Sequence, residues 1–269
     1  MNISPSRTAS PTIVYYEGRD GRRLAVRQWP CADALADVVF LHGIVSHAGW
    51  YESSCAHLAE NNFRVHFLER RGSGLNTEHR GDVDDWQTWL SDVAIYLENL
   101  TPRRPRILFG ISWGGILASS VARRPPALVD GLGLICPGLF SSKAANRFQR
   151  IALHVASTLG LRGMKVDVPL QDPALFTDSI EGQRYVAQDP LVLRRITIRF
   201  AANNLVLLRY ATEQPESIQV PVLLMLASSD PITLNASTVD FVRRMANPDQ
   251  TIIELSLIHI SEPTRRTIP

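Results

Sequence analysis

The stretch Gly110-Ile111-Ser112-Trp113-Gly114-Gly115 organises this 269-residue chain. A short, largely apolar run at 106–109 precedes it and predicts a buried strand. Residues 116–121 follow with the composition of a helix that packs on this strand. The serine therefore stands on a sharp turn between strand and helix, which is the setting that a G-x-S-x-G nucleophile elbow needs. A serine at an ordinary helix N-terminus is the alternative without catalysis.

Catalysis by Ser112 would need two hydrogen-bond donors for the oxyanion that forms when a carbonyl is attacked. One is the backbone N–H of Trp113, the residue after the serine. The other is expected from the loop after the apolar run 37–41, and we assign it to the N–H of Ile44. His42 in the same loop is expected to be structural, because a histidine at the end of a buried strand usually hydrogen-bonds its own loop.

A serine hydroxyl also needs a base, normally histidine, and an acid that orients this base. Asp230 directly follows the apolar run 220–226 and is the expected acid. Asp189 and Asp249 are weaker rivals, because each stands beside a proline in a turn where aspartate is common. The chain order serine, acid, histidine leaves His259 as the expected base, since no other histidine follows Asp230. The earlier histidines are expected mostly at surface or helix positions: His47, His57, His66, His79 and His154.

The composition excludes several classes of protein. A formal net charge of +2 without a long basic run gives no sign of nucleic-acid binding. Three cysteines without metal-ligand spacing predict a reducing compartment, with neither a disulfide framework nor a metal site. Residues 1–11 lack the apolar core of a signal peptide, and no apolar run is long enough for a membrane span. We therefore expect a cytoplasmic location.

Strand and helix patterns alternate along most of the chain, which predicts an α/β fold with a mostly parallel sheet and helices on both faces. Runs at 12–16 and 24–29 flank a turn at Asp20-Gly21 and predict a hairpin. The expected core domain comprises residues 12–140 and 217–255. Its other strand patterns lie at 37–41, 63–68, 106–109, 128–136, 220–226 and 251–255, and its helix patterns at 50–60, 86–100, 116–121 and 236–245.

Residues 141–216 interrupt this alternation and have helical spacing instead. We expect them to form a helical cap, or lid, above the strand ends and to line a pocket. A packed subdomain without a role in substrate choice is the alternative. The apolar residues that suggest one helix face are Phe148, Ile151, Val155 and Leu159, and those that suggest another are Ile196, Phe200 and Leu207.

Four motifs occur together along the chain: His42-Gly43, Glu69-Arg70-Arg71-Gly72-Ser73-Gly74, the stretch around Ser112, and Val222-Leu223-Leu224-Met225 followed by Asp230. In combination they resemble α/β-hydrolases of the monoacylglycerol lipase and lysophospholipase type, from about residue 12 to residue 255. The resemblance implies an eight-stranded sheet flanked by helices, a helical cap, and hydrolysis of acyl esters through an acyl-enzyme. It also implies Ser112 as nucleophile, Asp230 as acid, and Ile44 and Trp113 as oxyanion donors. Glu69 is a departure at a structural position, where the family usually has aspartate.

The C-terminus departs further from this pattern. The family has a turn, the catalytic histidine and a final amphipathic helix, whereas residues 255–265 end the chain without such a helix. This string resembles the translation of a sequencing-library adapter. We therefore expect residues 256–269 to be a non-native tail and the final helix to be missing. His259 would then stand near the expected position by accident.

The sequence thus favours a serine hydrolase that cleaves carboxylic esters without a metal or organic cofactor. Lipid-like esters, such as monoacylglycerol or lysophospholipid, are the expected small-molecule substrates, and transient contact of the cap with lipid surfaces is compatible with the sequence. Thioesterases and carbon–carbon bond hydrolases share this machinery and remain alternatives. A non-catalytic or truncated, inactive hydrolase-like binding protein is the alternative from a different class.

Overall fold

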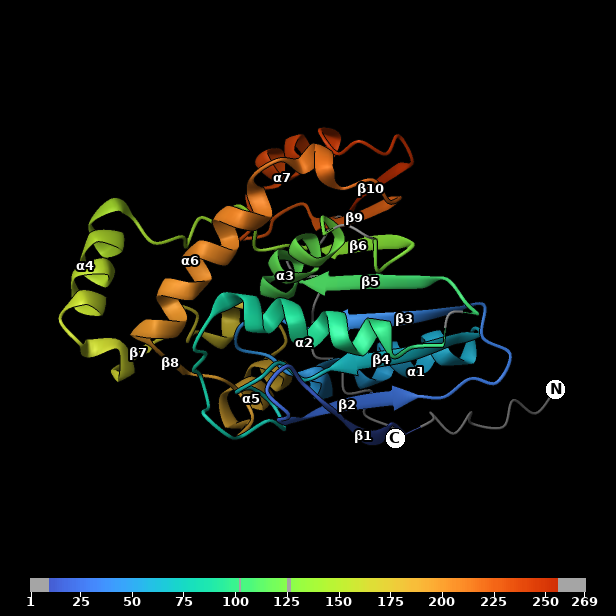
Figure 1. The fold of residues 1–269 in the computed structure, drawn as a ribbon, viewed down its shortest axis with the longest axis horizontal. Helices are drawn as coiled ribbons and strands as arrows, with labels where there is room; N and C mark the ends of the chain where they lie inside the picture. The colour runs from blue at the N-terminus through green and yellow to red at the C-terminus, as the bar shows by residue number, and fades with distance from the viewer. Residues whose placement is uncertain (1–9, 102, 125–126, 256–269) are drawn as a thin grey trace.

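The computed structural model describes residues 10–101, 103–124 and 127–255 of the chain. Its centre is an eight-stranded sheet with the strand order β1-β2-β4-β3-β5-β6-β9-β10 (Figure 1). β2 pairs antiparallel with β1 and with β4, and all other neighbours in this sheet are parallel. The strands are β1 (Thr12–Glu17), β2 (Arg23–Trp29), β3 (Ala36–Leu41), β4 (Phe63–Leu68), β5 (Arg106–Ile111), β6 (Gly131–Ile135), β9 (Val222–Ala227) and β10 (Gln250–Leu255).

Burial along the strands follows from their place in the sheet. β3 is buried along its whole length, as a central strand covered on both faces must be. β1 lies at the edge, and its residues are exposed or half-buried. The turn between β1 and β2 contains Gly21 at a φ of 75°, a conformation that suits glycine, so the predicted hairpin is confirmed. The predicted α/β class with a mostly parallel, eight-stranded sheet is confirmed as well.

Helices flank the sheet on both sides. In Figure 1, α2 and α3 lie in front of the sheet and α1 lies behind it. The predicted start of α2 is confirmed, because the Asp85 side chain accepts a hydrogen bond from the Gln87 N–H. The helix predicted from residue 50 begins instead as a 3₁₀ turn (Ala48–Tyr51), which His47 caps. These helices are α1 (Glu52–Glu60), α2 (Trp86–Glu98), α3 (Trp113–Ala122) and α7 (Asn235–Arg243).

Residues 141–216 contribute no strand to the eight-stranded sheet. Figure 1 shows α4 and α6 beyond the carboxyl end of β5, with α4 farthest from the sheet. α6 contacts α3 and α2, and it also contacts α4. The elements of this region are α4 (Arg147–Thr158), β7 (Lys165–Asp167), α5 (Ile180–Gln188), β8 (Arg195–Thr197) and α6 (Ile198–Thr212).

Two details of this region differ from the sequence-based expectation. Ile196 lies in β8, which pairs antiparallel with β7, and not on a helix, because β-branched residues such as Ile196 and Thr197 suit a strand. The apolar face of α4 forms, but it is turned to solvent, with Phe148 81% and Leu159 70% exposed. Within the described residues, no helix has both the length and the apolar character needed to cross a membrane.

Candidate active site

Ser112 stands between β5 and α3 in a strained backbone conformation, with φ 51° and ψ −117°. Such a conformation is costly for a residue with a Cβ atom and persists only where the surrounding structure holds it. Hydrogen bonds hold it here. The Ser112 N–H donates to the Ile135 carbonyl at 3.0 Å, and the Ser112 carbonyl accepts from Gly115 at 2.9 Å and Gly138 at 2.8 Å. The strand-turn-helix geometry predicted around this serine is therefore present.

Close backbone contacts explain the glycines of the elbow. A Cβ atom on Gly110 would lie 2.4 Å from the Gly114 carbonyl oxygen, and one on Gly114 would lie 2.1 Å from the Leu41 carbonyl oxygen. The second contact brings the start of α3 against the end of β3, where the loop with His42 and Ile44 begins. The two segments that carry the predicted oxyanion donors are therefore packed directly against each other.

His42 shapes this loop. Its Nδ1 lies 2.8 Å from the Gly43 carbonyl oxygen, and its Nε2 accepts the backbone N–H of Arg70 at 3.0 Å. Because Nε2 accepts, the proton of the neutral ring must be on Nδ1. Burial, reinforced by the charge of Arg70, holds the pKa of His42 well below its usual value. His42 is therefore a neutral, structural histidine, as the sequence predicts.

Arg70 ties the same loop to the elbow. Its Nη2 donates to the Ile44 carbonyl at 2.7 Å, its Nη1 donates to the Gly43 carbonyl at 3.3 Å, and its guanidinium lies 4.5 Å from the Trp113 ring centroid. No ion pair joins Arg70 to a carboxylate of the described residues. Burial accordingly lowers the pKa of Arg70 to about 9. One buried cation thus fixes both the carbonyl groups of the loop and the side chain beside Ser112.

Ser112 opens into a cavity of about 470 Å³ that core and 141–216 region line together. The lining from the core includes both predicted oxyanion residues, Ile44 and Trp113. No histidine is among the described residues that line this cavity. Most of the lining from 141–216 is apolar, with Leu153, Val168, Leu170, Ile196, Ala201, Leu205 and Leu208.

Asp230 lies at the same edge of the sheet as Ser112. Ser112 follows β5, Cys136 follows β6, and Asp230 follows β9, and these three parallel strands are consecutive in the sheet. The carboxylate accepts hydrogen bonds from the N–H groups of Ile232 at 2.8 Å and Thr233 at 3.0 Å. It also contacts the Cys136 thiol, whose pKa is raised to about 12 by burial and by this charge. Ile232, two residues further on, lines the Ser112 cavity.

The other predicted residues are placed differently. Asp249 directly precedes β10, so it lies at the amino edge of the parallel strands and away from Ser112. His259 and the predicted tail 256–269 lie outside the described residues. His47 and His66 were among the histidines expected mostly at surface or helix positions, but both are buried, beside the carboxylates of Asp189 and Asp37 respectively.

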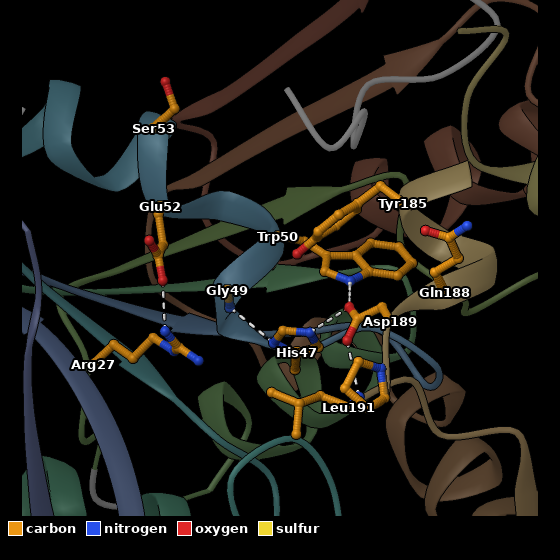
Figure 2. Close-up of a pocket in the computed structure, with 11 residues that line it drawn as sticks. Arg27, His47, Gly49, Trp50, Glu52, Ser53, Tyr185, Gln188, Asp189 and Leu191 are labelled. Atoms are coloured by element: carbon orange, nitrogen blue, oxygen red, sulfur yellow. Dashed lines mark hydrogen bonds and ion pairs between the residues drawn. The ribbon is translucent and has the colours of Figure 1, made fainter. Parts of the chain in front are cut away.

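A second cavity, of about 540 Å³, lies where α5 meets the loop after β3 (Figure 2). Asp189 is at its centre, and its Oδ2 accepts from His47 Nε2 at 2.7 Å and Trp50 Nε1 at 2.8 Å. Asp189 is not among the residues that line the Ser112 cavity. Asp189, one of the two weaker rivals for the catalytic acid, therefore joins the end of α5 to His47 and Trp50 by buried hydrogen bonds. Sequence reasoning missed this pair because 142 positions separate its two members.

Asp189→Asn is expected to lower the free energy of unfolding by about 2 kcal/mol at pH 7. Burial opposes the charge of Asp189, but hydrogen bonds from His47 and Trp50 outweigh it and lower its pKa from 3.8 to about 2. A carboxyl whose pKa is lower in the folded state stabilises the fold above the unfolded pKa, and this stabilisation is lost as the pH falls.

Urea unfolding of both chains at several pH values checks this expectation. The difference between the native chain and Asp189→Asn should fall to roughly half at pH 3. The opposite trend, with a difference that grows on acidification, would contradict the assignment of the ionised carboxylate.

A family model described as serine aminopeptidase, S33, matches residues 32–257. An uncharacterized abhydrolase domain-containing protein of Dictyostelium discoideum is 24% identical over 87% of this chain, which spans only 25% of that protein. The monoglyceride lipase of Mus musculus is also 24% identical, over 93% of this chain and 84% of its own length.

A solved structure, the monoacylglycerol lipase of Paleococcus ferrophilus, superposes with a TM-score of 0.77 at 24% identity. The match covers 86% of this chain and 88% of that one. This likeness shows a shared fold, and the family model extends over both the elbow and the strand before Asp230. The chain has the α/β-hydrolase fold, is similar to monoacylglycerol lipases, and belongs to the serine aminopeptidase S33 family of hydrolases.

Proposed function

We propose that this protein is a serine hydrolase that cleaves carboxylic esters through an acyl-enzyme on Ser112. The observation that carries the proposal is the strained Ser112 at the first turn of α3, open to an apolar cavity. Strain of this kind is kept where it serves a function. The N-terminus of α3 adds unpaired N–H groups beside the serine, and these favour an anion.

In the proposed reaction, the Ser112 hydroxyl attacks the ester carbonyl, and His259, or its natural counterpart if residues 256–269 are a non-native tail, takes its proton. Asp230 orients the imidazole, and the N–H groups of Ile44 and Trp113 donate to the oxyanion. The tetrahedral intermediate collapses, the C–O bond to the alcohol breaks, and the imidazolium protonates the departing alcohol. A water molecule, deprotonated by the same imidazole, then releases the carboxylic acid and restores the serine.

Lipid-like esters fit this site. The cavity walls from residues 141–216 are mostly apolar, so a hydrocarbon chain would lose water contact there, which is worth roughly 0.8 kcal/mol for each CH₂ group. We propose that residues 141–216 act as a cap over the core formed by residues 12–140 and 217–255. A monoacylglycerol or a lysophospholipid is the proposed substrate, and the similarity to the monoglyceride lipase of Mus musculus supports this choice.

A panel of 4-nitrophenyl and monoacylglycerol esters tests the proposal, together with labelling by a fluorophosphonate probe. Hydrolysis of esters and covalent labelling at Ser112 would support it. A folded chain that neither hydrolyses esters nor reacts with the probe would favour the non-catalytic binding protein instead. Ser112→Ala is the matched comparison, because hydrolysis or probe labelling that persists in this variant would place the reactive group elsewhere.

Arg70→Lys is expected to lower kcat for esters about tenfold with a smaller change in KM. A lysine cannot hold the Gly43 and Ile44 carbonyl groups together, so the proposed oxyanion donor would be less well fixed. Arg71→Lys is the matched control, because the Arg71 guanidinium binds Asp92 and not this loop. Steady-state kinetics of both variants test this expectation. An equal loss of kcat in Arg70→Lys and Arg71→Lys would refute a specific role of Arg70.

A further inference from the structure

Asn204 of α6 is hydrogen-bonded to the residue that follows the nucleophile. The Trp113 indole Nε1 donates to Asn204 Oδ1 at 2.6 Å. An indole N–H can only donate, so the atom that receives it must be the amide oxygen. This contact therefore fixes which way the Asn204 amide points, a choice that is otherwise ambiguous for asparagine side chains.

The same contact leaves the amide nitrogen of Asn204 available. No hydrogen bond joins Asn204 Nδ2 to an acceptor among the described residues. The side chain is half-buried and lines the cavity that contains Ser112. Its nearest neighbours on α6 in this cavity, Ala201, Leu205 and Leu208, are apolar, whereas Arg209 and Thr212 at the end of the helix are polar. Asn204 thus brings two N–H donors to a part of the wall that Ala201, Leu205 and Leu208 make apolar.

The adjacent Asn203 differs from Asn204, because both its amide oxygen and its amide nitrogen have hydrogen-bond partners within the protein. Its Oδ1 accepts from the Trp86 N–H at 3.0 Å, and its Nδ2 reaches the Arg199 carbonyl at 3.1 Å and the Asp84 carbonyl at 3.3 Å. Both ends of that amide are used inside the protein. Asn203 is not among the residues that line the cavity.

We propose that the Asn204 amide binds an oxygen atom carried by the acyl group of the substrate. This inference rests on the proposed ester hydrolysis and specifies its substrate class: esters whose acyl chain carries an ether, hydroxyl or keto oxygen. A plain hydrocarbon chain would displace water from the Nδ2 donors without replacing its hydrogen bonds. Because an unpaired buried donor is costly, a site with a fixed donor discriminates against ligands that lack the matching acceptor.

The test compares 4-nitrophenyl hexanoate with two analogues in which the CH₂ group at C4 or at C5 of the acyl chain is replaced by an ether oxygen, far enough from the carbonyl to leave its reactivity nearly unchanged. These pairs are similar in shape and differ mainly in the acceptor. For one position of the oxygen, kcat/KM relative to the hexanoate is expected to rise about three- to tenfold. The oxygen position with the largest ratio reports which carbon of the chain lies beside Asn204.

Asn204→Asp keeps an acceptor for the Trp113 indole but removes the two donors. The ratio of kcat/KM for the matching ether ester to kcat/KM for the hexanoate is therefore expected to fall to one or below. Asn204→Leu serves as a second variant if the aspartate variant does not fold. Asn203→Asp is the matched control, and it should keep the ratio of the native chain because that side chain does not line the cavity. Equal losses for all esters in Asn204→Asp, with the ratio unchanged, would overturn the proposal.

Binding to the Ser112→Ala chain gives a readout that needs no turnover. Isothermal titration with the same ester pairs should show tighter binding of the matching ether ester, by a similar factor. If binding shows the preference while no ester is hydrolysed, acceptor recognition stands and the proposed hydrolysis fails. If esters are hydrolysed but every ether position gives a ratio of one, the hydrolase proposal stands and the role of Asn204 is refuted.

Discussion

Ser112→Ala is expected to lower kcat/KM for esters by a factor of about 10⁴ or more. The hydroxyl is the proposed nucleophile, and alanine has no oxygen with which to form the acyl-enzyme. Residual hydrolysis would come from substrate binding and from the oxyanion donors alone. The measurement is the rate of 4-nitrophenyl ester hydrolysis by equal concentrations of folded native and variant chains. Turnover within tenfold of the native rate would exclude the proposed mechanism.

Backbone strain at Ser112 provides an independent control. The alanine variant retains a Cβ atom at a φ of 51°, so its stability should match that of the native chain. Ser112→Gly removes this Cβ and should raise the free energy of unfolding by about 1 kcal/mol while activity is lost. Urea unfolding of the three chains separates the two effects. A glycine variant less stable than the alanine variant would show that the strain is not relieved.

Gly114→Ala is expected to have the largest effect on stability, a loss of about 3 kcal/mol. The added Cβ would lie 2.1 Å from the Leu41 carbonyl oxygen, which belongs to the backbone of β3 and cannot rotate away. Helix α3 would have to move from the sheet, and the Trp113 N–H would move with it. Ester hydrolysis by the remaining folded chains should therefore fall as well.

Gly163→Ala is the matched control for this substitution. An added Cβ on Gly163 meets no atom within 4 Å, so the stability change should stay within about 0.5 kcal/mol. Thermal and urea unfolding of both variants give the comparison. Equal stability of Gly114→Ala and Gly163→Ala would contradict the close packing of α3 on β3.

Much of the fold could be predicted because its signals are local. The apolar runs, the Asp20-Gly21 turn and the cap residue Asp85 each act over a few neighbouring residues. The elbow around Ser112 is local too, since strand, turn and helix are consecutive in the chain. Asp230 was placed at the carboxyl edge of the sheet from its position after an apolar run, and the structure has it there. Its catalytic role remains a proposal.

The missed contacts join residues that are far apart in the sequence. His47 was among the histidines expected mostly at surface or helix positions, but Asp189, 142 positions further on, supplies the carboxylate that allows its burial. The Trp113 indole is satisfied by Asn204, 91 positions away. A large donor-bearing side chain beside Ser112 could have signalled that a buried acceptor was needed. Nothing in the sequence indicated which residue would provide it.

The sequence by itself determined the class of fold, the strained serine, and the glycines that let helix and strand meet. It could do so because backbone geometry depends on adjacent residues, and the absence of a Cβ is a property of one residue. Only the tertiary structure decided which polar groups are paired, such as Arg70 with the loop after β3 and Asn204 with Trp113. Buried donors and acceptors must find partners wherever the folded chain brings them, and sequence distance places no limit on that choice.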